Sequence, residues 1–237
     1  MKIALIGYGK MGKTIETIAI LRGHQVVLKI DADNLDDFEK IGQADVAIEF
    51  TRPESVVENL KKCFDFGIPV VCGTTGWLSR FDEVAAFCLE KNGAFLYASN
   101  YSIGVNIFFE INRRLADMMN GYDMYNIKMA ETHHTQKLDA PSGTAITLAN
   151  DILKKIDRKT QWTSNTEGVA ANEILITAQR IDPAPGTHVV TYESAIDTIE
   201  ISHTAHSREG FATGAVLAAE WILGKKGVFS MKDMLGF

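Results

Sequence analysis

The motif Gly-Tyr-Gly-Lys-Met-Gly at residues 7–12 constrains the fold more than any other feature of this chain. It follows the short apolar run KIALI and precedes a segment of helical period, after which the apolar run QVVLKI ends at Asp31. A strand, a glycine turn, a helix and a second strand within about thirty residues form the unit from which parallel sheets are built. The chain is therefore predicted to begin with a doubly wound parallel sheet.

The alternation of strands and helices continues to about residue 100. Further strands are predicted over 45–50, 68–76 and 93–100, and helices over 13–22, 53–66 and 79–91. A sheet built from such units is covered by helices on both faces. This part of the chain is therefore expected to have an α/β fold with a Rossmann-type sheet.

The pattern changes after Asn100. Strands are predicted over 125–134, 171–181, 186–195 and 197–205, and helices over 105–119 and 142–156. This order favours an α+β domain with a mixed or antiparallel sheet. An apolar helical segment over 211–223 is expected to return to the first domain. We thus predict a dinucleotide-binding domain of residues 1–100 and 208–237, and a substrate-binding and oligomerisation domain of residues 101–207.

Composition narrows the classes of function. The net charge of −6, without a dense run of lysine and arginine, argues against nucleic-acid or membrane-surface binding. No apolar run is long enough for a membrane span, and the run before Gly7 is too short for a signal peptide, so we expect a cytoplasmic protein. The cysteines Cys63, Cys72 and Cys88 lack metal-binding spacing and are expected to be buried, reduced thiols.

The glycine motif predicts binding of a dinucleotide. Gly7 permits the tight turn, Gly9 lets a pyrophosphate approach the backbone, and Gly12 lets helix and strand touch. The N–H groups at the start of the helix then face the anion. Asp31 is placed to accept hydrogen bonds from the adenosine ribose, which favours NADH over NADPH, although Lys10 and Lys29 would soften its repulsion of a 2′-phosphate. The alternatives are a structural glycine turn and a capping aspartate.

Two turns, Phe50-Thr51-Arg52-Pro53 and Gly73-Thr74-Thr75-Gly76, each follow a predicted strand. Ligands of open α/β sheets bind at the carboxyl ends of the strands. Small residues and hydroxyl groups there suit a nicotinamide ring and its carboxamide. Each turn alone is also compatible with a plain connection from strand to helix, but the glycine motif favours the cofactor role.

The segment ETHHTQKLDAPSGTA, residues 131–145, is the richest in reactive side chains. Backbone N–H groups at a helix start and the hydroxyl groups of Ser142 and Thr144 would form a site for a carboxylate, and Lys137 would add a positive charge. A histidine beside that site, His133 or its neighbour His134, is the side chain best suited to deliver a proton. The alternative is a solvated loop before a capped helix. We expect no metal site, because adjacent histidines point apart and no third ligand is evident.

The chain resembles the dihydrodipicolinate reductases, now named 4-hydroxy-tetrahydrodipicolinate reductases, of lysine and diaminopimelate biosynthesis. Residues 131–145 match the family pattern E-x-H-H-x-x-K-x-D-x-P-S-G-T-A, and GYGKMG, FTRPE, CGTTG, SNYSIGVN and SREGFATGA follow in the family's order. The resemblance covers essentially the whole chain. It departs from the family at Thr135-Gln136, where many members are more basic, and in its short length, which leaves oligomer contacts less certain.

This resemblance implies hydride transfer from NADH or NADPH to a cyclic unsaturated dicarboxylate in a homotetrameric oxidoreductase. His133 would be the general acid, and Lys137 would help to hold the substrate. The implied substrate-binding residues are His134, Ser142, Gly143 and Thr144. The motifs and the resemblance together imply these cofactor-binding residues: Gly7, Gly9, Lys10, Met11, Gly12, Asp31, Phe50, Thr51, Gly73, Thr75, Ser99, Asn100, Tyr101, Arg208 and Phe211.

Two other classes of function use a similar glycine motif. A dinucleotide-binding regulatory protein would have no turnover, and the His133/Lys137 pair argues against it. A dehydrogenase of sugars or amino acids with a similar layout would not need the anion site at Pro141-Ser142-Gly143-Thr144. Turnover of a cyclic dicarboxylate with either cofactor distinguishes all three.

Overall fold

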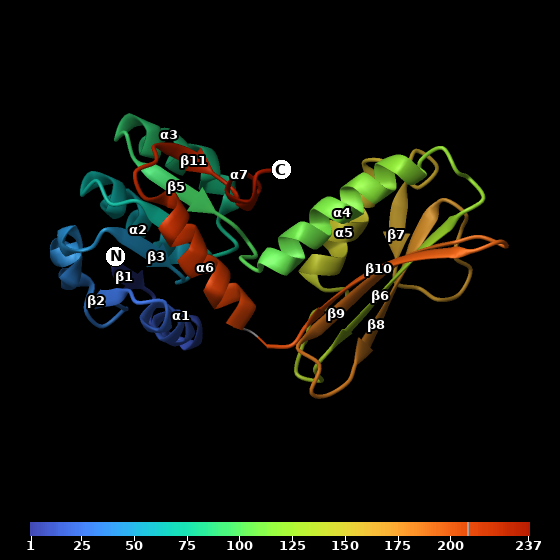
Figure 1. Ribbon diagram of the computed structural model, residues 1–237, viewed down its shortest axis with the longest axis horizontal. Helices are drawn as coiled ribbons and strands as arrows, with labels where there is room; N and C mark the ends of the chain where they lie inside the picture. The colour runs from blue at the N-terminus through green and yellow to red at the C-terminus, as the bar shows by residue number, and fades with distance from the viewer. Residues whose placement is uncertain (208) are drawn as a thin grey trace. The chain divides into compact units, whose positions relative to one another are not determined.

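The computed structural model describes residues 1–207 and 209–237 (Figure 1). Arg208, which was predicted to lie near the cofactor, falls outside the described residues. Contacts divide the chain into two compact units, one of Met1–Ile103 with Glu209–Phe237 and one of Gly104–Arg208. The roles predicted for the two domains, dinucleotide binding and substrate binding, stay predictions.

Unit 1 contains a parallel sheet with the strand order β11-β5-β4-β3-β1-β2. Its strands are β1 (Lys2–Ile6), β2 (Gln25–Ile30), β3 (Val46–Glu49), β4 (Val70–Cys72), β5 (Ala94–Tyr97) and β11 (Gly227–Phe229). The chain runs outward from β1 to β2 and then crosses to β3 on the other side of β1, so the order reverses between β1 and β3. The carboxyl ends of these strands are therefore the expected place for a ligand.

Helices cover both faces of this sheet, as Figure 1 shows. One face packs against η1 (Leu35–Gln43), α2 (Pro53–Asp65) and α3 (Phe81–Glu90). The short helix η2 (Leu78–Arg80) directly precedes α3 in the chain. The other face packs against α1 (Lys10–Leu21), α6 (Glu209–Ile222) and α7 (Met231–Leu235). The predicted doubly wound fold is confirmed. Helix α1 begins at Lys10 and not at Lys13, because Gly9 already serves as its N-cap residue.

Unit 2 contains a mixed sheet with the order β10-β9-β6-β8-β7. Its elements are α4 (Ile103–Met119), β6 (Asn126–His133), α5 (Gly143–Leu153), β7 (Gln161–Thr163), β8 (Glu173–Arg180), β9 (Gly186–Glu193) and β10 (Thr198–Ala205). Strand β6 pairs in parallel with β8 and antiparallel with β9. Helices α4 and α5 lie on one face of this sheet and share a core with it (Figure 1). The mixed sheet was predicted, whereas the short strand β7 was not.

Burial alternates along β6 with a period of two. Ile127, Met129, Glu131 and His133 are buried on the face that packs against the helices, and the residues between them are more exposed. Successive side chains of a strand point to opposite faces of the sheet, so Glu131 and His133 lie on the same, inner face. This alternation brings a carboxylate and an imidazole into the interior of unit 2.

Within the described residues, no helix is both long and apolar enough to cross a membrane. Cys63, Cys72 and Cys88 are all buried and form no disulfide, as predicted. Burial raises the pKa of each thiol, which disfavours the reactive thiolate. The three cysteines therefore contribute to the core of unit 1 and not to chemistry.

Candidate active site

The glycines of the motif between β1 and α1 are placed as their predicted roles require. Gly7 has φ +90°, and a Cβ there would lie 2.0 Å from the carbonyl oxygen of Phe50. A Cβ on Gly12 would lie 2.3 Å from the carbonyl oxygen of Gly7, so this contact of helix and turn requires glycine. A Cβ on Gly9 would meet nothing within 4 Å. The backbone at Gly9 is therefore open to a ligand.

A cavity of about 660 Å³ lies at the carboxyl ends of β1, β2 and β3. It is lined by Ile6, Gly7, Gly9, Ile30, Asp31, Ala32, Leu35, Phe50, Thr51, Arg52, Glu54, Ser55 and Asn59. Apolar walls with a few polar groups at this position are typical of nucleotide sites in doubly wound sheets. Five of the predicted cofactor-binding residues thus line one cavity, and Lys10 and Met11 follow in the first turn of α1.

Asp31 lies at the end of β2 and lines the cavity. Its Oδ1 accepts a hydrogen bond from the N–H of Ala32 at 2.9 Å, which holds the carboxylate at this edge. Lys29 instead forms an ion pair with Glu16 at 2.6 Å and donates to the hydroxyl of Tyr8 at 3.1 Å. Because Lys29 is already paired, its proposed compensation of a 2′-phosphate would require a broken ion pair.

The turns after β3 and β4 are joined by a carboxyl group that the sequence analysis did not single out. Glu49 is completely buried and accepts hydrogen bonds from Thr51 Oγ1 and, at 2.7 Å, from Thr74 Oγ1. The N–H of Thr51 donates to Thr74 Oγ1 at 2.7 Å. Burial raises the pKa of Glu49 above its ordinary range. Thr74 is therefore occupied within the fold, whereas Thr75 is exposed.

The two turns also touch directly. A Cβ on Gly73 would lie 2.1 Å from the ring of Phe50, so glycine is needed for that ring to cover the turn. The predicted nicotinamide residues Phe50, Thr51 and Gly73 thus form one connected surface.

The remaining residues that were predicted to bind the cofactor differ in their burial and hydrogen bonding. Tyr101 is buried, and its hydroxyl donates to the carbonyls of Cys72 at 2.8 Å and Leu96 at 3.1 Å, so its side chain supports the sheet. Ser99 is exposed, while Asn100 accepts a hydrogen bond from the N–H of Ser102 at 2.9 Å. Phe211 is half-buried in the first turn of α6. These residues belong to unit 1 but do not line the cavity described above.

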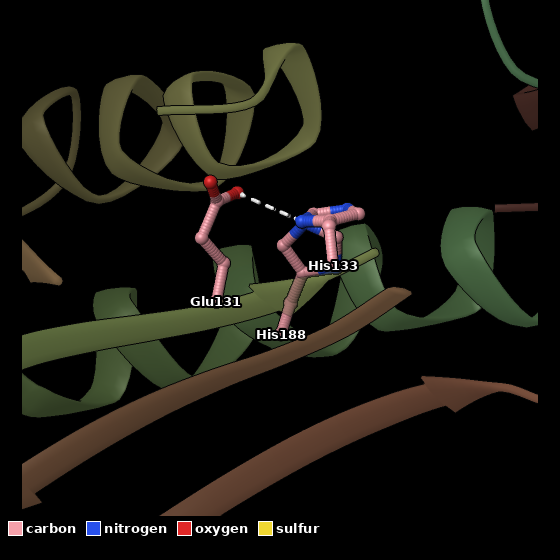
Figure 2. Close-up of side chains that lie close together, drawn as sticks. All are labelled: Glu131, His133 and His188. Carbon is pink, nitrogen blue, oxygen red and sulfur yellow. Dashed lines mark ion pairs between the residues drawn. The ribbon is translucent and has the colours of Figure 1, made fainter. Parts of the chain in front are cut away.

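The chemically distinctive cluster of unit 2 consists of Glu131, His133 and His188 (Figure 2). Oε2 of Glu131 lies 3.7 Å from Nδ1 of His133 and 3.6 Å from Nε2 of His188. The two imidazole rings meet edge to face, with centroids 5.0 Å apart and planes at 73°. All three side chains are buried, and they come from the adjacent strands β6 and β9.

Arg180, at the end of β8, connects this cluster to the loop that follows β6. Its Nη2 lies 3.3 Å from Oε1 of Glu131 and donates to the carbonyl of Asp139 at 2.6 Å, while Nε donates to the carbonyl of Lys137 at 3.2 Å. Nζ of Lys137 contacts both carboxylate oxygens of Asp139, at 2.7 and 2.8 Å. The lysine is thus held near the cluster. His134 is half-buried and is not part of the cluster.

Helix α5 begins next to the cluster. The N–H of Ser142 donates to both oxygens of Glu131 at 3.1 Å, and its Oγ caps the helix by accepting from Ala145 N–H at 3.2 Å. The same Oγ lies 3.0 Å from Nε2 of His188. Ser142 is thus occupied within the fold. The next residue, Gly143, is exposed, and a Cβ there would meet nothing within 4 Å, which leaves the helix start open.

The burial of the cluster sets its protonation at neutral pH. Burial lowers the pKa of His133 to about 4, although the nearby Glu131 acts to raise it. Burial alone would raise the pKa of Glu131, but hydrogen bonds from His188 and Ser142 outweigh it and bring the pKa to about 2. The carboxylate is therefore ionised and the His133 ring neutral at neutral pH.

Glu131, His133 and His188 present three possible ligand atoms within 4.8 Å of one another, so the absence of a third candidate ligand was a wrong inference. The carboxylate, however, already contacts the Ser142 N–H and the Arg180 guanidinium. A cation beside it would face that guanidinium at close range. We therefore interpret the cluster as a network of ion pairs and hydrogen bonds.

Sequence reasoning missed Glu49, Arg180 and His188. Glu131 is part of the segment 131–145, and it lies two residues before His133 on a predicted strand. This separation indicates that the two side chains lie on the same face of the sheet. Arg180 and His188 lie on other strands, and the pairing register that brings them to β6 is not legible in the sequence.

Comparisons with known proteins agree with this arrangement. The family models described as the N-terminus and the C-terminus of dihydrodipicolinate reductase match residues 1–101 and 104–235. The chain is 51% identical to a 4-hydroxy-tetrahydrodipicolinate reductase of Christiangramia forsetii, covering 99% of this chain and 98% of that protein. It is 38% identical to one of Methanosarcina mazei, covering 99% and 89%. The fold also matches a solved dipicolinate-bound dihydrodipicolinate reductase from Paenisporosarcina sp. TG-14, with TM-score 0.78, 20% identity and 97% coverage of each chain.

Proposed function

The chain belongs to the dihydrodipicolinate reductase family, and we propose that it reduces 4-hydroxy-tetrahydrodipicolinate, with His133 as proton donor. It is an NAD(P)H-dependent oxidoreductase of lysine and diaminopimelate biosynthesis. The observation that carries the assignment of the donor is the buried His133 beside the open start of α5. Bound NAD(P)H supplies the hydride.

The glycine turn and cavity of unit 1 support cofactor binding. The N–H groups at the start of α1 would hold the pyrophosphate, for which the backbone at Gly9 leaves space. The connected turns at Phe50, Thr51 and Gly73 would hold the nicotinamide, and exposed Thr75 would add a hydroxyl group. Glu49 holds these turns together through Thr51 and Thr74.

The start of α5 supports binding of the substrate carboxylates. Backbone N–H groups of Gly143 and Thr144 have no partner within the helix, and the helix dipole favours an anion there. Lys137 adds a positive charge once a substrate carboxylate replaces Asp139 as its partner. The role first assigned to the Ser142 hydroxyl passes to these N–H groups, because that hydroxyl caps the helix.

A dianionic substrate also changes the state of His133. Its pKa of about 4 keeps the ring neutral in the free protein. Two substrate carboxylates near the ring favour the imidazolium form and raise its pKa. The ring thus takes up a proton on binding and returns it to the substrate atom that hydride transfer leaves electron-rich.

Dipicolinate, as a cyclic dicarboxylate that is not reduced, should bind competitively with the substrate. Binding of dipicolinate that leaves the apparent KM for the substrate unchanged would contradict this site.

Asp31→Ala is expected to shift cofactor preference from NADH towards NADPH. The change removes a ribose acceptor and a charge that repels the 2′-phosphate, so the ratio of the two kcat/KM values should move by about tenfold. Steady-state kinetics with both cofactors measure this ratio. Asp33→Ala is the matched control, because Asp33 does not line the cavity. If Asp31→Ala leaves the ratio of the two kcat/KM values unchanged, Asp31 does not contact the adenosine ribose.

Lys137→Ala is expected to raise the KM for substrate about tenfold and to leave NADH affinity unchanged. The loss of one charge-assisted contact to a carboxylate accounts for this size. Initial rates and fluorescence titration with NADH separate the two effects. Lys128→Ala is the control, since Lys128, on β6 of the same unit, is also paired with a carboxylate, that of Glu193 at 2.6 Å. An equal loss of NADH binding in Lys137→Ala would place this lysine in the wrong pocket.

We further propose a homotetramer, which the family resemblance supports, in the cytoplasm, with a preference for NADH. Light scattering tests the first, and a dimer or monomer at working concentration would contradict it. The acidic Asp31 at the predicted ribose position supports the preference for NADH.

A further inference from the structure

The carboxylate of Glu131 is buried at the centre of the cluster in unit 2. Its side chain is 0% exposed and lies close to groups of its own strand β6, of β8 and β9, and of the N-cap of α5. Ser142 N–H donates to both oxygens at 3.1 Å, and Arg180 lies 3.3 Å from Oε1. Oε2 faces His133 and His188, as Figure 2 shows. A buried carboxylate with this many partners is fixed in position, so it can fix its neighbours in turn.

The orientation of the His133 ring follows from this carboxylate. Nδ1 of His133 is buried without a hydrogen-bond partner in the described residues, and it faces Oε2 of Glu131 at 3.7 Å. A lone pair on Nδ1 would face a negative charge, whereas an N–H there would be attracted to it. The favoured neutral tautomer therefore carries its proton on Nδ1. The lone pair of the ring is then on Nε2.

The other edge of the ring is left open by a glycine. A Cβ on Gly186 would lie 3.1 Å from Nε2 and 3.2 Å from Cδ2 of His133. Glycine at this position therefore keeps a side chain from crowding Nε2. The ring therefore has one nitrogen turned to a fixed carboxylate and one turned away from it.

We propose that Glu131 is the positioning residue of the proton donor: its carboxylate holds the proton of neutral His133 on Nδ1 and makes Nε2 the atom that takes up and delivers the catalytic proton. This inference rests on the proposed function. A solvent proton binds to Nε2 when the dianionic substrate binds. After hydride addition, the Nε2–H bond breaks while the electron pair on the substrate forms the new bond to that proton. His133 returns to its neutral form with Nδ1–H retained.

The charges around His133 make Glu131 decisive. The titratable and charged groups that face the ring are Glu131 on β6, His188 on β9, Arg180 on β8 and Lys137 in the loop after β6. Burial, His188, Lys137 and Arg180 lower the pKa of His133, and Glu131 raises it. Without the carboxylate, burial and all the remaining charged neighbours disfavour the imidazolium form that donates the proton.

Glu131→Gln tests the inference, because it keeps the size of the side chain and an oxygen for the Ser142 N–H while it removes the charge. The expected loss of kcat at neutral pH is about tenfold to a hundredfold, with the substrate KM changed only a few-fold. The active form of His133 exists below its pKa in the complex and disappears as pH rises through it. The high-pH limb of kcat should therefore move to lower pH by about one unit or more.

Two controls separate positioning from a purely structural role. Glu131→Asp retains the charge and should keep the pH limb close to that of the parent protein, and Glu193→Gln, at the end of β9, should change neither kcat nor the limb. A limb that does not move in Glu131→Gln overturns the proposal. So does a loss of kcat on treatment with EDTA, which would assign the cluster to a metal ion.

A second measurement uses the parent protein and needs no turnover. In ¹⁵N-histidine NMR spectra at neutral pH, the ring signal that disappears in His133→Gln should show the Nδ1–H tautomer. The Nε2–H tautomer would overturn the inference even if the protein is an active reductase. Conversely, an Nδ1–H tautomer in a protein without turnover would leave the positioning intact and contradict the proposed function.

Discussion

His133→Gln is expected to lower kcat by about 10²- to 10³-fold, the usual scale for the loss of a positioned general acid. Glutamine retains a polar side chain but cannot deliver the proton. Because His133 contributes no described hydrogen bond through its ring, the fold should persist, and because it belongs to unit 2, NADH binding to unit 1 should persist as well. Steady-state kinetics, NADH titration and thermal unfolding measure the three quantities.

His134→Gln is the matched control for this prediction. His133 lies on the buried face of β6 with Glu131, whereas His134 follows the end of that strand and is half-buried. We therefore expect His134→Gln to affect KM more than kcat. If His134→Gln removes most of kcat while His133→Gln mainly raises KM, the two histidines are assigned in the wrong order. Lost thermal stability with near-normal turnover in His133→Gln would show a structural role.

Gly7→Ala is expected to destabilise unit 1 by about 3 kcal/mol and to weaken NADH binding at least about tenfold. The added methyl group would lie 2.0 Å from the carbonyl oxygen of Phe50, and φ at this position is +90°. Either the glycine turn at Gly7 or the start of the Phe50-Thr51 turn must move to make room for the methyl group. Both line the cavity proposed to bind the cofactor, so stability and affinity should fall together. Urea denaturation and NADH titration measure them.

Gly9→Ala separates the two effects. A Cβ on Gly9 would meet no protein atom within 4 Å, so the free energy of unfolding should change by less than about 0.5 kcal/mol. NADH affinity should nevertheless fall, because the methyl group occupies space that the pyrophosphate needs. Unchanged NADH affinity in Gly9→Ala would contradict the predicted path of the cofactor across this turn.

The fold of unit 1 was predictable because local signals agreed with one another. Apolar strands, glycine turns and helices of regular period repeat from residue 2 to residue 97, and each signal comes from neighbouring residues. Elements with weak local signals were missed in both units, namely η1, β11 and α7 of unit 1 and β7 of unit 2. Three-residue strands such as β7 (Gln161–Thr163) form because a neighbouring strand offers a partner, which a short sequence window does not contain.

The candidate active site was predictable only in part for the same reason. His133, Lys137 and the start of α5 stand in one continuous segment, so their proximity follows from the chain itself. Arg180 and His188 join them through the pairing of β8 and β9 with β6, at separations of about fifty residues. The alternation along β6 distinguishes the surroundings of the two neighbouring histidines, because it buries His133 with Glu131 and leaves His134 half-buried.

The central claim is tested most directly by following oxidation of NADH and NADPH by the purified protein in the presence of 4-hydroxy-tetrahydrodipicolinate. The account predicts saturable turnover with at least one cofactor, competitive inhibition by dipicolinate, and a loss of about 10²- to 10³-fold in His133→Gln under the same conditions. Cofactor binding without oxidation, with both cofactors and at saturating substrate, would contradict a reductase and leave only a dinucleotide-binding protein.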